Sequence, residues 1–429
     1  MVEALPVEDV AGIIAELARE ARVEGMRLVL TRRGEQLVDA VRDVLVDSVI
    51  PPEELEEALR WTGVLLGELS RAASLLGARG WSFPRELKSF IEDPRLHLRK
   101  KLFNYVFDLA RGKIGVDEFI RRGEAAVRTS LRTNLRSIYQ DWVFAAILSG
   151  LGERGGRLVY PETKIILLER TGRQRSGSIP PNAVVRLPRG EVSFFLEAPR
   201  PVGWEDNRDL EKIWKLYVTL RPDMLVYSGR VLDILDPSGD PPIRRPNIIV
   251  ECKELSDWYE RSRDLRGPLA RPLRALEWRA RWLKGLEEGL ADVLGVDRAR
   301  FKEFTQGRAP SVRVREHRLL LLYKETFQPD AFYLISRARV PQDVRGDLES
   351  HGVIVLDGVE IGDRRALEEL VDHVARIASP VEESLEDLLR RVLEEAVESG
   401  RDPVESLGRA ALEWLARHGD GLARRVLER

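Results

Sequence analysis

Residues 247–254 read NIIVECKE, and this short stretch does most to define the fold. Its first half is apolar and rich in β-branched residues, which is typical of a buried strand. Because successive side chains of a strand alternate between its two faces, Glu251 and Lys253 share one face and Cys252 points to the other. A lone cysteine behaves as a small buried residue, so Cys252 is expected in the core. The strand should therefore present a carboxylate and an ammonium group side by side at its end.

A second strand is predicted upstream, in residues 216–229 (LYVTLRPDMLVYSG), where Asp223 directly follows Pro222. The intervening segment, residues 229–246, is rich in Gly, Pro and Asp and is long enough to reverse the chain. If the two strands pair as neighbours, Asp223 approaches Glu251.

The remaining sequence predicts a mixed α/β protein in three parts. Helical periodicity dominates residues 1–127, and two further helices are expected within residues 379–429. A long helix is expected over 128–149, ending at the glycines around Gly150 and Gly152. Between these parts the sequence alternates apolar strand-like runs with a helical stretch, which indicates a sheet flanked by helices. The predicted domains are a helical N-terminal domain (1–127), an α/β domain (128–378) and a C-terminal helical segment (379–429). The strand-like runs lie at 158–169, 191–198, 317–326, 331–336 and 353–359.

The composition excludes several classes of protein. The single cysteine, Cys252, rules out an intramolecular disulfide and a cysteine-based zinc site. No apolar run approaches the roughly 20 residues that span a bilayer, and the N-terminus is acidic rather than a basic signal peptide. We therefore expect a soluble, cytoplasmic protein. Arginine far outnumbers lysine and 33% of residues are charged; this bias is typical of thermophiles, and a GC-rich genome produces it too.

Asp223, Glu251 and Lys253 suit the hydrolysis of a phosphodiester. Mg²⁺ prefers oxygen ligands and is commonly held by one or two carboxylates with water and phosphate oxygens. Asp223 and Glu251 could hold the ion, with the backbone carbonyl of Cys252 as a further ligand. Lys253 would position or deprotonate the attacking water and offset negative charge in the transition state.

This pattern, Pro222-Asp223 followed by Glu251-Cys252-Lys253 at a strand end, resembles the PD-(D/E)xK nuclease superfamily. The resemblance implies a restriction-endonuclease-like fold with an α-β-β-β-α-β core, and a DNA nuclease that depends on Mg²⁺ or Mn²⁺ and can act as a homodimer. Many members also place an acidic or amide residue on the first core helix, and Gln140 or Asp141 could take this position here. The resemblance also implies that Asp223, Glu251 and Lys253 are the catalytic residues.

The predicted site has competing interpretations. Acid-x-Lys triplets also occur at residues 86–88 and 162–164, and a second Pro-Asp pair at 329–330, but none of them has both strands in the required order. The alternative to an enzyme is a catalytically inactive module of the same fold that acts in nucleic-acid binding or in protein assembly, with the N-terminal helices contacting a protein partner.

A net charge of only −2 means that a DNA-binding protein must concentrate its basic residues on one surface. Arginines that follow the triplet could contact phosphates, with Trp258 and Tyr259 interleaved for stacking on bases. The alternative is a solvated helix face balanced by nearby glutamates. The arginines in question are Arg261, Arg263, Arg266, Arg271 and Arg274.

Overall fold

The structure of the protein, a computed structural model, describes two compact units, Met1–Ala378 and Ser379–Arg429. The predicted boundary after residue 378 coincides with this division. The predicted boundary after residue 127 falls inside one continuous helix, so the N-terminal helices and the sheet belong to the same unit. The residues described are 7–24, 27–170, 178–198, 200–204, 214–217, 221–236, 243–265, 312–378, 388–389, 392–393, 396–397, 399–417 and 421–427.

The N-terminal part is mainly helical, as its apolar periodicity predicts. Thr31 caps α2 by accepting a hydrogen bond from the Gly34 amide at 3.0 Å, and α3 starts at Pro52, where a missing N–H costs nothing. Two short strands, β1 and β2, form a hairpin that the sequence did not indicate, and β3 pairs with β5. The elements are α1 (Val7–Glu20), β1 (Ala21–Glu24), β2 (Arg27–Leu30), α2 (Arg32–Val49), α3 (Pro52–Leu76), β3 (Gly80–Ser82), α4 (Arg85–Glu92), α5 (Pro94–Lys101), α6 (Phe103–Ala110) and α7 (Val116–Glu153).

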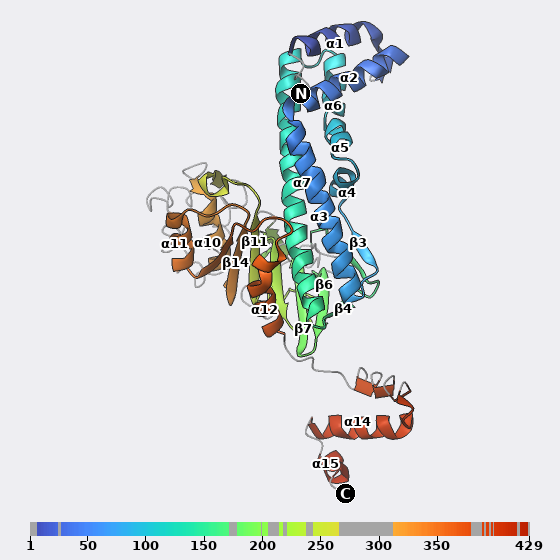
Figure 1. Cartoon of the computed structure of the whole chain (residues 1–429), viewed down its shortest axis with the longest axis vertical. Coiled ribbons are helices and arrows are strands. Elements are labelled where there is room, and N and C mark those ends of the chain that lie inside the picture. Colours follow the sequence, from blue (N-terminus) through green and yellow to red (C-terminus); the bar gives the residue numbers. More distant parts are fainter. Residues whose placement is uncertain are drawn as a thin grey trace. The chain divides into compact units, whose positions relative to one another are not determined.

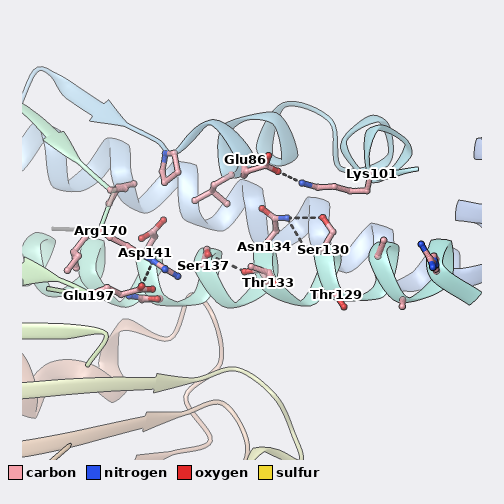
Figure 2. Close-up of a pocket in the computed structure, with 18 of the residues that line it drawn as sticks. Glu86, Lys101, Thr129, Ser130, Thr133, Asn134, Ser137, Asp141, Arg170 and Glu197 are labelled. Carbon is pink, nitrogen blue, oxygen red and sulfur yellow. Dashed lines mark hydrogen bonds and ion pairs between the residues drawn. The ribbon is translucent and has the colours of Figure 1, made fainter. Parts of the chain in front are cut away.

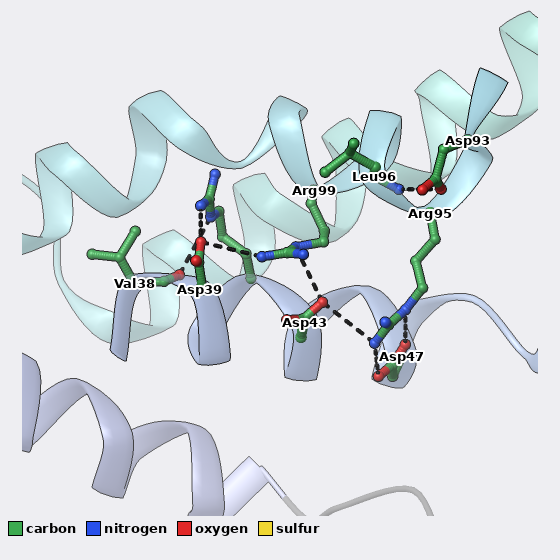
Figure 3. A network of polar contacts seen from close by, with 9 residues as sticks. Val38, Asp39, Asp43, Asp47, Asp93, Arg95, Leu96 and Arg99 are labelled. Carbon is green, nitrogen blue, oxygen red and sulfur yellow. Dashed lines mark hydrogen bonds and ion pairs between the residues drawn. The ribbon is translucent and has the colours of Figure 1, made fainter. Parts of the chain in front are cut away.

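A charge network joins α2 to α5 (Figure 3). Three aspartates of α2 are spaced four residues apart and therefore share one face, and two arginines of α5 have the same spacing. Arg99 bridges Asp39 and Asp43 at 3.1 Å each, and Arg95 bonds Asp47 at 2.7 Å. Because each arginine of α5 pairs with particular aspartates of α2, the network fixes the register of one helix against the other.

A seven-stranded mixed sheet forms the centre of the first unit, in the order β15-β14-β11-β10-β7-β6-β4. β10 pairs antiparallel with β7 and with β11, whereas β14 and β15 continue parallel to β11. Figure 1 shows α7 crossing this sheet beside α3. The strands are β4 (Arg157–Tyr160), β6 (Ala183–Leu187), β7 (Gly190–Leu196), β10 (Met224–Ser228), β11 (Ile248–Lys253), β14 (Ala331–Ser336) and β15 (Val353–Asp357); smaller pairs involve β5 (Ile165–Leu167), β8 (Arg200–Trp204), β9 (Trp214–Tyr217), β12 (Ser262–Leu265) and β13 (Val312–Arg315).

Each face of the sheet has its own apolar core, and strand alternation assigns side chains between them. On one face Val250 and Cys252 pack in the core that includes Tyr139 and Trp142 of α7. On the other face Ile249 packs against residues of α10 and α11. The core-facing position predicted for Cys252 is confirmed. The helices on this second side are α10 (Glu316–Phe327) and α11 (Gln342–Ser350), whereas α12 (Glu368–Arg376) packs in the first core with α7.

The helix predicted over 128–149 is longer at both ends, because α7 runs from Val116 to Glu153. Gly150 and Gly152 do not terminate it. A Cβ atom at Gly150 would lie 2.7 Å from a methyl group of Val371, and one at Gly152 would lie 2.6 Å from Cβ of Leu75. These glycines allow α12 and α3 to approach α7 closely. They are therefore required for helix packing and do not mark the end of α7.

The strand predicted over residues 317–326 (HRLLLLYKET) is wrong, because these residues lie in helix α10. A short apolar run does not distinguish a buried strand from a buried helix. Leu, Lys and Glu favour the helix. The decisive constraint is topological: β14 is parallel to β11, and a parallel connection needs a crossover segment, which α10 provides.

The second unit contains helices at Pro403–Arg417 (α14) and Gly421–Leu427 (α15). The first of the two helices predicted there lies mostly outside the described residues. Within the ranges given above, none of the helices combines the length and apolar character that crossing a bilayer requires.

Candidate active site

Asp223 and Glu251 come together because β10 and β11 pair in antiparallel register. Met224 lies opposite Val250, so the next pair along the strands is Asp223 and Glu251. The backbone N–H of Asp223 donates to Glu251 Oε2 at 3.2 Å, and the N–H of Cys252 donates to Asp223 Oδ2 at 2.7 Å. The Glu251 carboxylate therefore accepts from the backbone of Asp223, and the Asp223 carboxylate accepts from the residue after Glu251. These two hydrogen bonds hold the carboxylates close together.

Lys253 lies on the same face as Glu251, as the alternation predicts. Its Nζ contacts Glu251 Oε1 at 3.0 Å and Glu316 Oε1 at 3.1 Å. Glu316 is the first residue of α10 and only 5% exposed. The ammonium group thus links the end of β11 to the helix that covers this face of the sheet.

The protonation of the cluster follows from burial and charge. Burial, followed by the nearby Glu251 carboxylate, raises the pKa of Asp223 well above its ordinary value. For Lys253, burial alone would lower the pKa, but Glu251 and then Glu316 outweigh it and raise the pKa above the ordinary lysine value. Lys253 is therefore an ammonium group at neutral pH, whereas burial and the Glu251 charge disfavour the ionised form of Asp223.

These residues line a cavity of about 300 Å³ at the end of the sheet, between α7 and α10. Six cationic side chains face five carboxylates in its wall. The cations exceed the carboxylates even though the whole chain carries a formal charge of −2. The cationic residues are Arg132, Arg136, Arg170, Arg221, Lys253 and Arg261, and the carboxylates are Glu197, Asp223, Glu251, Glu254 and Glu316.

One face of α7 carries Arg132, Arg136 and Gln140, which are spaced four residues apart, and the two arginines line the cavity. Gln140 Nε2 donates to the backbone carbonyl of Asp223 at 3.2 Å and so holds the turn that precedes β10. Burial would lower the pKa of Arg136, but Asp223 and then Glu197 raise it. The guanidinium group is thus held in the field of the site's carboxylates.

The predicted accessory residues Gln140 and Asp141 both line a second cavity along α7. Gln140 also bonds the backbone carbonyl of Asp223, at the candidate active site. Asp141 is 5% exposed. Its burial, followed by the charge of Glu197, raises its pKa well above the ordinary value.

The arginines predicted after the triplet have different outcomes. Arg261 lines the cavity and is paired with Asp257 at 3.0 Å. Arg263 lies in β12, where its side chain is not described, and three others lie outside the described residues: Arg266, Arg271 and Arg274. The backbone carbonyl predicted as a ligand, that of Cys252, stays a prediction, since the structure defines only its amide as a donor to Asp223.

Sequence reasoning missed several residues of this site. Glu316 was hidden by the wrong strand prediction for its segment. Arg132 and Arg136 had a usable signal, because they precede Gln140 by eight and four positions on the same helix face. Glu197 had none: it ends β7 with a left-handed backbone (φ 41°) that is costly for a residue with a Cβ, and its N–H donates to the Asp223 carbonyl at 3.0 Å.

The donor set fits a hard divalent cation. Asp223 and Glu251 offer carboxylate oxygens, and Mg²⁺ is commonly held by one or two carboxylates while it keeps several waters. Among the residues that the structure describes, no group of three or more His, Cys, Asp or Glu side chains is arranged to hold a metal ion. A site here would therefore depend on two carboxylates, with water and substrate oxygens as the other ligands.

No family model matches this chain, and no curated protein or solved structure matches it either. The interpretation of the site depends on its geometry and chemistry.

Proposed function

We propose that this protein is a metal-dependent nuclease that hydrolyses phosphodiester bonds of DNA. The observation that carries the proposal is the convergence of Asp223, Glu251 and Lys253 at the edge of a cavity lined by arginines. Two carboxylates and a lysine on adjacent strands match what phosphodiester hydrolysis requires, which is a hard cation and a stabiliser of negative charge.

The order of elements supports this proposal. α7, β7, β10, β11, α10 and β14 occur along the chain in the order α-β-β-β-α-β, with an antiparallel meander followed by a parallel strand. Strands outside this series intervene, and two of them, β4 and β6, extend the same sheet beyond β7. The α-β-β-β-α-β order is the core order expected from the resemblance to the PD-(D/E)xK superfamily. The carboxylates also lie where ligands commonly bind in such sheets, outside the carboxyl ends of parallel strands.

The charges of the cavity wall support a phosphate-bearing substrate. Arg132 and Arg136 project from adjacent turns of α7, and Arg261 enters from the segment after β11. Guanidinium groups pair well with phosphate oxygens and stay charged at all relevant pH values. The arrangement suits a nucleic-acid backbone whose phosphates bind the arginines and pass close to the two carboxylates.

Asp223 and Glu251 would hold Mg²⁺ or Mn²⁺, which when bound supplies Lewis acidity toward the phosphate group. The hydrogen bonds from the Cys252 and Asp223 amides orient both carboxylates before any ligand arrives. Lys253, whose raised pKa keeps it protonated, donates hydrogen bonds to the site. Its role is therefore to neutralise and position, and not to accept the proton of the attacking water.

The test is cleavage of supercoiled plasmid and linear DNA with Mg²⁺ or Mn²⁺, with RNA assayed in parallel. Asp223→Asn, Glu251→Gln and Lys253→Met should each reduce the rate at least ~100-fold, the scale seen when a transition-state donor is removed. Two matched controls make the same kind of change in similar motifs outside the site. Asp330→Asn changes the other Pro-Asp pair, and Glu162→Gln changes another acid-x-Lys triplet. Both controls should cleave like the wild type.

Undiminished cleavage by all three site variants would overturn the assignment. Absence of cleavage by the wild type, together with no heat of Mn²⁺ binding in calorimetry, would favour an inactive module of the same fold. RNA cleavage at a rate above that for DNA would move the substrate class to RNA while keeping the same site.

A further inference from the structure

A second cavity, here called the α7 groove, runs along α7 beside α4 and α5 (Figure 2). Its volume is about 810 Å³. Thr129, Thr133, Ser137 and Asp141 line it at intervals of four residues, so they share one helix face. The row from Thr129 to Asp141 covers about 18 Å at 1.5 Å per residue.

Asp141 is the residue that points to a ligand. It is 5% exposed, it lines the groove, and its Oδ2 has no hydrogen-bond partner in the described part of the chain. Figure 2 shows its carboxylate directed from α7 into the space between α7 and the α4 segment. A buried polar atom without a partner is unfavourable and is uncommon in folded proteins. A ligand in the groove would satisfy it.

The groove leads into the candidate active site. Thr133, Arg170 and Glu197 line both cavities. Glu197, with its left-handed backbone, is paired with Arg170 and its N–H donates to the carbonyl of Asp223. A chain lying in the groove therefore passes Glu197 and reaches the carboxylates of the active site.

The lining has the chemistry of a surface that reads base edges. Hydroxyl and amide groups from Ser130, Thr133, Asn134 and Ser137 line the middle, and groups of this kind hydrogen-bond to base edges. The basic side chains there are already balanced, as with Lys101, which is paired with Glu86. The dimensions suit one strand, because about 18 Å accommodates a few bases stacked 3.4 Å apart, and binding cavities for single ligands hold about 300–1,000 Å³.

We propose that the α7 groove binds a few unpaired nucleotides of the strand whose neighbouring phosphodiester lies at Asp223 and Glu251. This proposal rests on the proposed nuclease function and names its substrate class, a nucleic acid with a single-stranded extension. The arginine-lined cavity takes the phosphates, and the groove takes the bases.

The test compares fluorescently labelled duplexes that are blunt or carry a five-nucleotide tail at either end, by anisotropy in EDTA. A tail of one polarity should raise the affinity at least about tenfold, the scale of discrimination that one well-bonded base provides. Thr129→Trp fills the groove from an exposed position of α7 and should abolish the gain. Ser74→Trp, an equally exposed position of α3 outside the groove, should keep it.

Asp141→Leu gives a second, independent readout. Leucine has a similar size and no polar atoms, so the variant should unfold at a higher temperature than the wild type and yet lose most of the tail-dependent affinity. A lower unfolding temperature together with unchanged tail binding would mean that Asp141 serves the fold alone, which would overturn its proposed role.

The outcomes separate this proposal from the nuclease assignment, because binding is measured without a divalent metal. Equal affinity for blunt and tailed duplexes, or equal loss in the Thr129 and Ser74 variants, overturns the groove and leaves cleavage untouched. Groove-dependent tail binding by a protein that cleaves nothing with Mn²⁺ would support the groove and overturn the nuclease.

Discussion

Replacing Asp223 by asparagine should stabilise the metal-free protein while it removes metal binding. Asp223 and Glu251 are opposite one another on neighbouring strands, where like charges are unfavourable, and burial increases that cost. Asparagine keeps an acceptor for the Cys252 amide, which now bonds Asp223 Oδ2 at 2.7 Å. We expect a gain of roughly 1–3 kcal/mol, the scale of the desolvation penalty of a buried polar group.

The stability difference between Asp223→Asn and the wild type should depend on pH. The folded-state pKa of Asp223 is raised above the ordinary aspartate pKa of about 3.9. Below about pH 3.9 the carboxyl group is protonated in both states and does not lower the stability of the wild type. As the pH rises through the folded-state pKa, the wild type loses stability. The advantage of Asp223→Asn should therefore be small near pH 4 and should grow as the pH rises toward neutrality.

The assay is thermal unfolding of the full chain in EDTA and in Mn²⁺ at both pH values. In EDTA at neutral pH the variant should melt about 1–4 °C above the wild type, since about 1 kcal/mol shifts a unit of the size of Met1–Ala378 by roughly 1 °C. Mn²⁺ at about 100 times its dissociation constant should stabilise the wild type by about 2.7 kcal/mol and leave the variant unchanged.

Asp330→Asn is the matched control, because Asp330 also follows a proline but is exposed and paired with Arg245 at 2.8 Å. Loss of such a surface pair costs about 0–1 kcal/mol, so the control should melt at or slightly below the wild type and respond to Mn²⁺ as it does. A less stable Asp223→Asn in EDTA, or a variant that Mn²⁺ still stabilises, would refute the reasoning.

Three further predictions follow from the site and from the N-terminal helices. The raised pKa of Lys253 predicts a cleavage rate without an alkaline decline below about pH 10, whereas a rate that rises through an apparent pKa near about 8, with the rise eliminated by Lys253→Met, would show that neutral lysine acts as a base. Arg136→Ala should reduce the slope of log binding constant against log salt concentration by about 1, as for one lost phosphate contact, and an unchanged slope in a salt titration would exclude that contact. Arg99→Met removes two bridges to α2 from a side chain that is 20% exposed, and should lower stability by roughly 1 kcal/mol in chemical denaturation, less at high salt; equal loss at low and high salt would mean that apolar packing, not charge, holds α2 to α5.

The candidate site shows what local sequence could predict. Strand alternation is a property of successive residues, so it placed Glu251 and Lys253 together and Cys252 in the core without knowledge of the rest of the chain. The partner strand needed one further assumption, antiparallel pairing. The structure supplies it through the register that sets Met224 opposite Val250 and brings Asp223 to Glu251.

The errors arose where local pattern was ambiguous. The leucine-rich segment 317–326 suits a strand or a helix equally by its apolar run, and the parallel pairing of β14 with β11 selects the helix. Gly150 and Gly152 read as a helix end because nothing in the sequence shows that Val371 and Leu75 lie against them.

By itself, the sequence determined the face and order of the catalytic candidates, because these depend on the two-residue period of a strand and on a proline-aspartate pair beside it. Tertiary structure alone decided which distant side chains join them. Glu316 reaches Lys253 only because α10 crosses the sheet, and Arg132 and Arg136 reach the cavity only because α7 lies along its wall. The α7 groove depends on the same contacts between helices far apart in the chain, and such contacts leave no periodic trace in a single sequence.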